Sequence, residues 1–137
     1  MHYVEPGEEK LVQEVFSSTW GFPVTVIPYL DIQKPLVALL DRRPVGAALL
    51  NKYTGNLDLG VQVTAEHRRR GIGSALVTEA LAYYHRRGFD YMYVVRNLPV
   101  GGLEEADEVA LRFYFATGAT LLREYTGFRL LPCESAH

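Results

Sequence analysis

Three consecutive arginines and two closely spaced glycines form the pattern in this chain that is most suited to chemistry. The run Arg68–Arg70 is followed directly by Gly71 and, two positions later, by Gly73. An apolar strand pattern precedes the run, and a helical periodicity of apolar residues follows it. The inner face expected for that helix consists of Ile72, Leu76, Ala80 and Tyr83. The run therefore occupies a tight turn between a strand and a helix N-terminus.

Such a turn is an expected anion site. The first N–H groups of a helix have no intrahelical partner, and the helix dipole places partial positive charge on them. Gly71 and Gly73 have no Cβ, so a bulky anion can approach the backbone and the turn can adopt positive φ. Arginine adds charge and forked donors. The alternative is a surface turn whose arginines are only solvated.

Two common phosphate motifs do not fit this turn. A P-loop requires a lysine after its last glycine, and none follows Gly73. The dinucleotide fingerprint requires a third glycine where this chain has Leu76. The remaining pattern, Arg68-x-x-Gly71-x-Gly73, resembles the Gln/Arg-x-x-Gly-x-Gly/Ala signature of the GNAT superfamily of acyl-CoA-dependent N-acetyltransferases. The resemblance implies that the turn binds the pyrophosphate of coenzyme A.

A second segment resembles the same family. Residues 110–114 read Ala-Leu-Arg-Phe-Tyr and resemble the family pattern Asn-x-x-Ala-x-x-Phe/Leu-Tyr, with Gly118 in the place of the glycine that follows. The family asparagine falls at Asp107, and Ala119 replaces an aromatic residue. The two motifs occur in the family order, and the resemblance covers roughly residues 45–125.

The resemblance implies a set of site residues around acetyl-CoA, the cosubstrate. Backbone groups of Val61 and Val63 would hold the pantetheine arm and the thioester carbonyl. Tyr114 would protonate or hydrogen-bond the departing thiolate, since a phenol has a pKa near ~10 and a thiol near ~8.5. The complete coenzyme-binding set is Val61, Gln62, Val63, Arg68, Arg69, Arg70, Gly71, Ile72, Gly73, Ser74, Asp107 and Tyr114.

The acceptor amine must lose a proton before it attacks, and Asp58 is the candidate base. The resemblance implies a carboxylate on the strand that leads into the turn, and Asp58 is the only ionisable residue from Leu57 to Val63. The alternative is a solvated strand carboxylate. The catalytic residues expected from the sequence are thus Tyr114 and Asp58.

Composition limits the remaining possibilities. The chain has 137 residues, of which 48% are hydrophobic, and this suits a single domain over residues 1–137. A net charge of -2 argues against bulk nucleic-acid binding. The sequence shows neither a membrane-spanning run nor a signal segment, so we expect a cytoplasmic protein without a membrane partner. The single cysteine, Cys133, excludes an internal disulfide, and the histidine spacing predicts no metal site.

The expected fold is α+β with α/β-type layers. It is a GNAT-like fold with a mixed, mostly antiparallel sheet, one parallel splayed strand pair and helices on both faces. The segments 2–5, 36–40, 45–50, 57–63, 91–95 and 121–131 are predicted as strands, the last as one or two. Helices are predicted over 8–18, 71–87 and 109–118, with an exposed loop over 96–108.

The predicted function is transfer of an acetyl group from acetyl-CoA to a primary amine by a monomer or homodimer. The acceptor is left open between a cationic small molecule and a protein amine. A non-catalytic acyl-CoA-binding module is the alternative that Asp107 favours, because an acid there is less suited to a pyrophosphate. A nucleic-acid-binding protein using Arg68–Arg70 is a third possibility, which the acidic balance disfavours.

Overall fold

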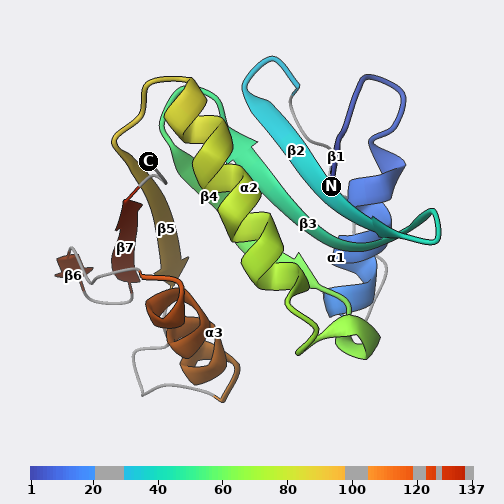
Figure 1. The fold of residues 1–137 in the computed structure, drawn as a ribbon. Helices are drawn as coiled ribbons and strands as arrows, with labels where there is room; N and C mark the ends of the chain where they lie inside the picture. Colours follow the sequence, from blue (N-terminus) through green and yellow to red (C-terminus); the bar gives the residue numbers. More distant parts are fainter. Residues whose placement is uncertain (21–29, 98–104, 119–122, 126–127, 135–137) are drawn as a thin grey trace.

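The computed structural model describes residues 1–20, 30–97, 105–118, 123–125 and 128–134. Within them, three consecutive strands, β2 to β4, lie between the first two helices (Figure 1). In order they are β1 (His2–Tyr3), α1 (Lys10–Trp20), β2 (Gln33–Leu40), β3 (Arg43–Asn51), β4 (Asn56–Val63), a 3-10 turn (Ala65–His67), α2 (Ile72–Arg86), β5 (Tyr91–Asn97), α3 (Glu105–Ala116), β6 (Arg123–Tyr125) and β7 (Phe128–Glu134). None of the helices described is long and apolar enough to cross a membrane.

The strands form one mixed sheet in the order β1-β2-β3-β4-β5-β7-β6. The pair β4–β5 is parallel, and the other pairs are antiparallel. The helix α2 lies between β4 and β5 in sequence, which gives the crossover that a parallel pair needs. The predicted mixed, mostly antiparallel sheet is confirmed.

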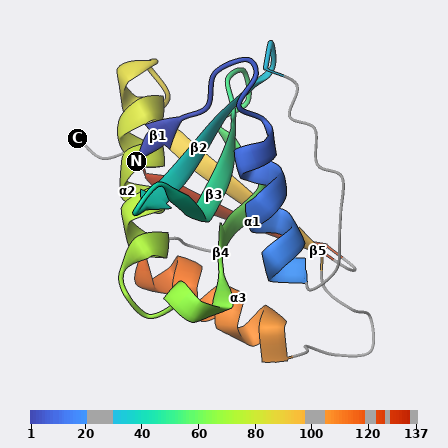
Figure 2. The same cartoon turned by 90° about the vertical axis from the view of Figure 1, so that its right-hand side faces the viewer.

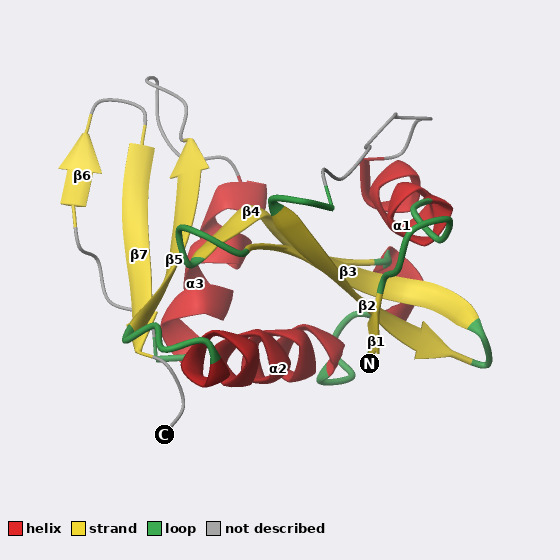
Figure 3. Cartoon of the chain, turned by 90° about the horizontal axis from the view of Figure 1, so that it is seen from above, coloured by secondary structure: helices red, strands yellow, loops and turns green. Residues whose placement is uncertain are grey.

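Helices cover both faces of the sheet, as predicted. On one face, α1 packs Val12, Val15 and Phe16 against buried residues of β2 and β3. On the other face, α2 and α3 share a core with the sheet. Figures 2 and 3 show α1 and α2 on opposite sides of the strands, with α3 on the α2 side. The two faces therefore have separate apolar cores.

The hairpin between β2 and β3 has a tighter turn than the predicted segment 41–44. Its two turn residues, Asp41 and Arg42, have positive φ values of 50° and 67°. A two-residue turn with positive φ at both positions matches the right-handed twist of the flanking strands. Because the turn ends at Arg42, Arg43 and Pro44 belong to β3.

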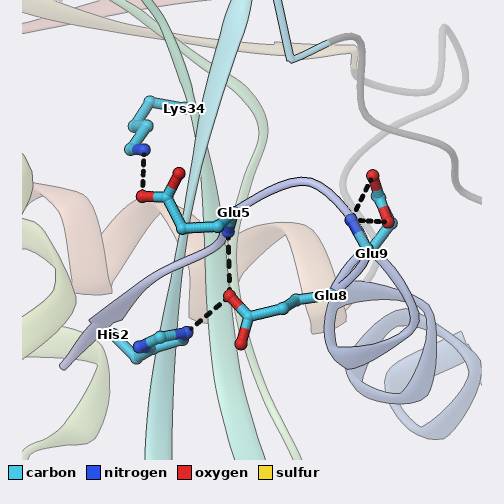
Figure 4. A network of polar contacts seen from close by, with 6 residues as sticks. His2, Glu5, Glu8, Glu9 and Lys34 are labelled. Carbon is cyan, nitrogen blue, oxygen red and sulfur yellow. Dashed lines mark hydrogen bonds and ion pairs between the residues drawn. The ribbon is translucent and has the colours of Figure 1, made fainter.

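Polar contacts hold the connection between β1 and α1 (Figure 4). The helix α1 begins at Lys10, whereas the predicted helix begins at Glu8. The Glu8 carboxylate accepts a hydrogen bond from the Glu5 backbone N–H and contacts His2 Nε2, both at 3.0 Å. The Glu5 N–H, followed by the His2 contact, lowers the Glu8 pKa. Lys34 Nζ of β2 pairs with Glu5 at 3.0 Å. The contacts join β1, the start of α1 and β2.

The buried face of α2 differs from the predicted one at four positions. Leu76 and Ala80 are buried as predicted, Val77 and Tyr84 are buried in addition, and the predicted Ile72 and Tyr83 are only half-buried. Tyr84 can be buried because its hydroxyl donates to the Asn56 backbone carbonyl at 2.7 Å. Burial, followed by the charge of Asp58, raises the pKa of Tyr84.

The helix α3 begins at Glu105, four residues before the predicted start. The segment 105–108, which was predicted as part of a loop, forms its first turn. Asp107 lies in this turn. Residues 119–122 and 126–127, within the region predicted as the last strands, lie outside the described residues.

Candidate active site

The parallel pair opens soon after it forms. Pairing between β4 and β5 is limited to Asn56 with Tyr93 and Leu57 with Val94, and the Tyr93 N–H donates to the Gly55 carbonyl at 2.9 Å. Beyond Leu57, β4 continues to Val63 paired only with β3. The predicted splayed pair is therefore present, and one edge of β4 is open.

A bulge in β4 lies where the pair opens. Ala48 pairs with Val61 and the adjacent Leu49 pairs with Asp58, so Leu59 and Gly60 are extra residues on β4. Both have left-handed φ values, 62° and 70°. A leucine in this region costs about 1–2 kcal/mol, and such strain concentrates at functional sites. The Gln62 side-chain amide donates a hydrogen bond to the Leu59 carbonyl at 3.1 Å, which stabilises the bulge.

The backbone groups of Val61 and Val63 face the open edge. The Thr64 N–H donates to the Val45 carbonyl of β3, and alternation along an antiparallel pair makes Gln62 the next residue bonded to β3. Val61 and Val63 therefore direct their N–H and C=O groups away from β3. The Val61 N–H donates to the Tyr114 hydroxyl at 2.9 Å, and the Val63 carbonyl accepts from Arg68 Nε at 3.0 Å.

The hydroxyl of Tyr114 lies at the bulge. The side chain comes from α3 and is 5% exposed, and its ring packs edge-on against Phe113 with centroids 5.1 Å apart. A Cβ added to Gly60 would lie 2.6 Å from the hydroxyl oxygen. Glycine is therefore required at position 60 both for its backbone conformation and for space. The structure places this phenol beside the backbone that was predicted to hold the thioester.

The turn before α2 has the shape of an anion site. Gly71 caps the helix with φ 79°, no side chain caps it there, and the first ladder bond runs from the Ala75 N–H to the Gly71 carbonyl at 2.9 Å. The N–H groups of Ile72, Gly73 and Ser74 precede that bond and point out of the helix end. A Cβ at Gly71 would meet no atom within 4 Å. The open donors fit the negatively charged oxygens of a pyrophosphate.

The two glycines of the motif have different surroundings. Whereas the space at Gly71 is open, a Cβ at Gly73 would lie 3.0 Å from the Phe113 ring of α3. The glycine at position 73 therefore lets α3 pack against the start of α2. The same helix thus carries Phe113 to the turn and Tyr114 to the bulge.

The three arginines also differ in their contacts. All three are exposed, but Arg68 donates through Nε to the end of β4, and Arg69 has φ 62°. Arg70 also lines an apolar groove of about 230 Å³ between α2 and the β2–β3 hairpin. The structure brings together the predicted residues from Val61 to Ser74 with Tyr114. Their assignment to coenzyme A remains a prediction.

The carboxylate of Asp58 lies on the other face of the sheet. It pairs in register with Leu49, whose side chain belongs to the α1 core, whereas Val61 packs against the α2 core. Three side-chain amides surround it, from Gln33, Asn51 and Asn56. The sequence analysis did not identify these amides, since they come from three different strands. It also gave Gly60 no role in the site, although an isolated glycine in a strand pattern indicates a bulge or a close approach.

The chain belongs to the GNAT acetyltransferase family. The family model "Acetyltransferase (GNAT) family" matches residues 9–116, most of the sequence. The predicted resemblance is therefore confirmed, and with it the acyltransferase class of the protein. Comparison with curated proteins gave no match.

Several solved structures share the fold of this chain. The ribosomal-protein-S18-alanine N-acetyltransferase from Escherichia coli has a TM-score of 0.75 at 11% identity, covering 99% of this chain and 93% of its own. An aminoglycoside 6'-N-acetyltransferase complexed with coenzyme A has a TM-score of 0.75 at 13% identity, covering 100% and 98%. A putative GNAT acetyltransferase from Desulfovibrio desulfuricans has a TM-score of 0.75 at 17% identity, covering 98% of each chain. At these identities the likeness shows the fold alone.

Proposed function

We propose that this protein transfers the acetyl group of acetyl-CoA to a primary amine. The observation that carries the proposal is the hydrogen bond from the Val61 N–H to the Tyr114 hydroxyl. It lies where β4 separates from β5 and continues to the turn before α2. A hydroxyl, a free strand edge and an anion site thus follow one another along one face of the molecule. These are the parts needed to hold a thioester with a pyrophosphate tail.

The coenzyme's two ends would be held by different groups. The N–H groups of Ile72, Gly73 and Ser74 would take the pyrophosphate, with Arg69 and Arg70 adding charge. The open edge at Val61 and Val63 would take the pantetheine arm. The Tyr114 and Arg68 contacts on that edge would have to rearrange where the arm bonds directly to the same backbone atoms. Structures of similar fold that contain coenzyme A or acetyl-CoA support this assignment of the cosubstrate.

In the acyl-transfer step, Tyr114 donates a proton to the leaving sulfur. The amine nitrogen forms a bond to the carbonyl carbon, the carbon–sulfur bond breaks, and the thiolate takes a proton. The Tyr114 oxygen accepts from the Val61 N–H, and in this proposal its hydroxyl donates its proton to that sulfur. The proton lost by the amine goes to Asp58 or to water.

The acceptor is proposed at the level of an amine. The two N-acetyltransferases named above act, by their names, on a ribosomal protein and on an aminoglycoside. A protein amine and a cationic small molecule therefore both remain within the proposal, as does the cytoplasm as its location. Asp107 in the first turn of α3 favours the second candidate, a protein that binds acyl-CoA without transfer.

Coenzyme A binding to Gly71→Glu tests the coenzyme site. Gly88 provides the matched control, because it has φ 85°, meets no atom within 4 Å and follows the opposite end of the same helix. Both substitutions carry a similar backbone cost, but only Gly71→Glu places a carboxylate on the donors. Losing one charge-assisted hydrogen bond costs about 1.5–3 kcal/mol, roughly 10- to 150-fold in affinity.

The expected result is that Gly71→Glu loses at least that much affinity for coenzyme A by titration calorimetry, while Gly88→Glu binds like the wild type. Equal affinities in the two variants would remove the turn from the proposal. Coenzyme A binding without thiol release from acetyl-CoA, over a broad amine panel, would identify the non-catalytic alternative.

A further inference from the structure

The guanidinium of Arg68 occupies the open edge of β4. Its Nε donates to the Val63 carbonyl at 3.0 Å, and Val63 directs that carbonyl away from β3. The pantetheine arm of the proposed coenzyme site needs the same carbonyl as an acceptor. One of the backbone groups that would hold the arm is therefore already bonded to a side chain from the turn before α2.

The backbone at Arg68 is held in place, whereas its side chain is exposed. The Thr64 N–H, at the start of the 3-10 turn, donates to the Val45 carbonyl of β3 at 2.9 Å, and the His67 ring contacts Thr64 Oγ1 at 2.8 Å. The Arg68 N–H closes the turn on the Ala65 carbonyl at 3.5 Å. Its guanidinium can therefore turn from the strand edge toward the helix end without a change in this backbone.

The N-terminal end of α2 is close to the same guanidinium. Arg68 precedes Gly71 by three residues, so their Cα atoms are at most about 11 Å apart. A guanidinium has five N–H donors, and the Val63 carbonyl uses one of them. Among the described residues, none of the ion pairs involves Arg68. Its charge is therefore available to an anion bound at the first N–H groups of α2.

An anion at this helix end competes with the Val63 carbonyl for Arg68. A phosphate is negatively charged and can accept two parallel N–H bonds from one arginine, whereas the carbonyl is neutral and accepts one. The guanidinium therefore favours the anion, and its departure leaves the carbonyl free for the pantetheine arm. A thioester without the anion has to displace Arg68 by itself.

We propose that Arg68 is a specificity-determining residue, which bonds to the Val63 carbonyl while the turn is empty and leaves it when a pyrophosphate binds. The site then selects coenzyme A thioesters against thioesters of unphosphorylated pantetheine. This inference rests on the proposed acetyl transfer for its function, but the coupling between the two halves of the coenzyme can be measured by binding alone.

The test is an NMR titration of the wild-type chain with pantetheine, with and without saturating inorganic pyrophosphate. Pyrophosphate should raise the affinity for pantetheine at least about fivefold, and by reciprocity pantetheine should raise the affinity for pyrophosphate by the same factor. Arg68→Met keeps a long side chain without donors. It should bind pantetheine alone as tightly as the wild type does with pyrophosphate, and added pyrophosphate should change nothing. Independent binding of the two compounds to the wild type would show that the Val63 carbonyl accepts both donors, and would overturn the proposal.

Arg43→Met is the matched control, because Arg43 is also an exposed arginine but belongs to β3, outside the proposed site. It should retain the full coupling, and loss of the coupling in this variant as well would contradict a specific role of Arg68.

A kinetic arm relates the coupling to turnover. Arg68→Met should raise kcat/KM for S-acetylpantetheine about fivefold and lower it for acetyl-CoA, whereas equal changes with the two thioesters would contradict the selection. Absence of turnover in the wild type, with the coupling present, would refute acetyl transfer while supporting the role of Arg68.

Discussion

A single methyl group at Gly60 should disable the Tyr114 hydroxyl. The added Cβ would lie 2.6 Å from that oxygen, whereas ordinary contact begins at 3.4 Å. The phenol must therefore move by about 0.8 Å, the difference of these two distances. A shift of that size away from the bulge lengthens the 2.9 Å bond to the Val61 N–H to about 3.7 Å. That exceeds the usual limit of a hydrogen bond.

The cost has two parts that can be measured separately. Alanine at φ 70° costs about 1–2 kcal/mol, and the lost hydrogen bond with its displaced phenol about 1–3 kcal/mol more. Removing the hydroxyl relieves the second part, since the next Tyr114 atom, Cζ, would be 3.8 Å from the new Cβ. Gly60→Ala should therefore destabilise the wild type more than the Tyr114→Phe variant.

The assay is a double-mutant cycle on Gly60→Ala and Tyr114→Phe, followed by denaturant unfolding and by thiol release from acetyl-CoA. We expect a coupling of about 1–3 kcal/mol in stability, and a turnover loss in Gly60→Ala as large as in Tyr114→Phe. Gly88→Ala, with similar φ and open space, controls for the backbone term alone. Additive stability losses, or wild-type turnover in Gly60→Ala, would refute the reasoning.

Three further outcomes follow from the same contacts. Tyr114→Phe should lower turnover about ten- to a thousandfold at unchanged coenzyme A affinity, and unchanged turnover would leave Tyr114 as a packing residue. Asp58→Asn should depress kcat/KM for the amine most at low pH, where the amine is most protonated, and a pH-rate profile equal to that of the wild type would assign proton removal elsewhere. Burial, followed by the hydrogen bond to Glu79, raises the Tyr3 pKa to about 12 from 10.0. Folding therefore favours the neutral form of Tyr3, so its stabilising contribution is complete below pH 10 and is lost as the pH rises to about 12. The alkaline unfolding curves of the wild type and Tyr3→Phe should differ in that range. Identical curves would contradict this prediction.

Local sequence signals predicted the fold and the glycine turn before α2 well. Gly71 and Gly73 after an apolar strand, and the periodicity of α2, are contained in a short stretch of chain. The parallel pair followed from a strand, a helix and a strand in order. The choice of Tyr83 over Tyr84 was wrong because helical periodicity alone could not include the Asn56 carbonyl, which lies 28 residues away and satisfies the Tyr84 hydroxyl.

The features that the sequence did not predict depend on contacts between distant segments. The start of α3 was placed too late because its acidic first turn resembles a loop in composition. The packing role of Gly73 depends on Phe113, which is 40 positions later. The three side-chain amides around Asp58 come together only through the register of β2, β3 and β4. Neither can be obtained from spacing within one motif.

The most direct test of the account is the release of free thiol from acetyl-CoA by the purified wild-type chain with a panel of primary amines, with mass spectrometry of the amine product. The account predicts amine-dependent thiol release and an N-acetylated product, with Tyr114→Phe at least about tenfold slower. Coenzyme A binding without thiol release for any amine in the panel, or thiol release that is independent of the amine, would contradict it.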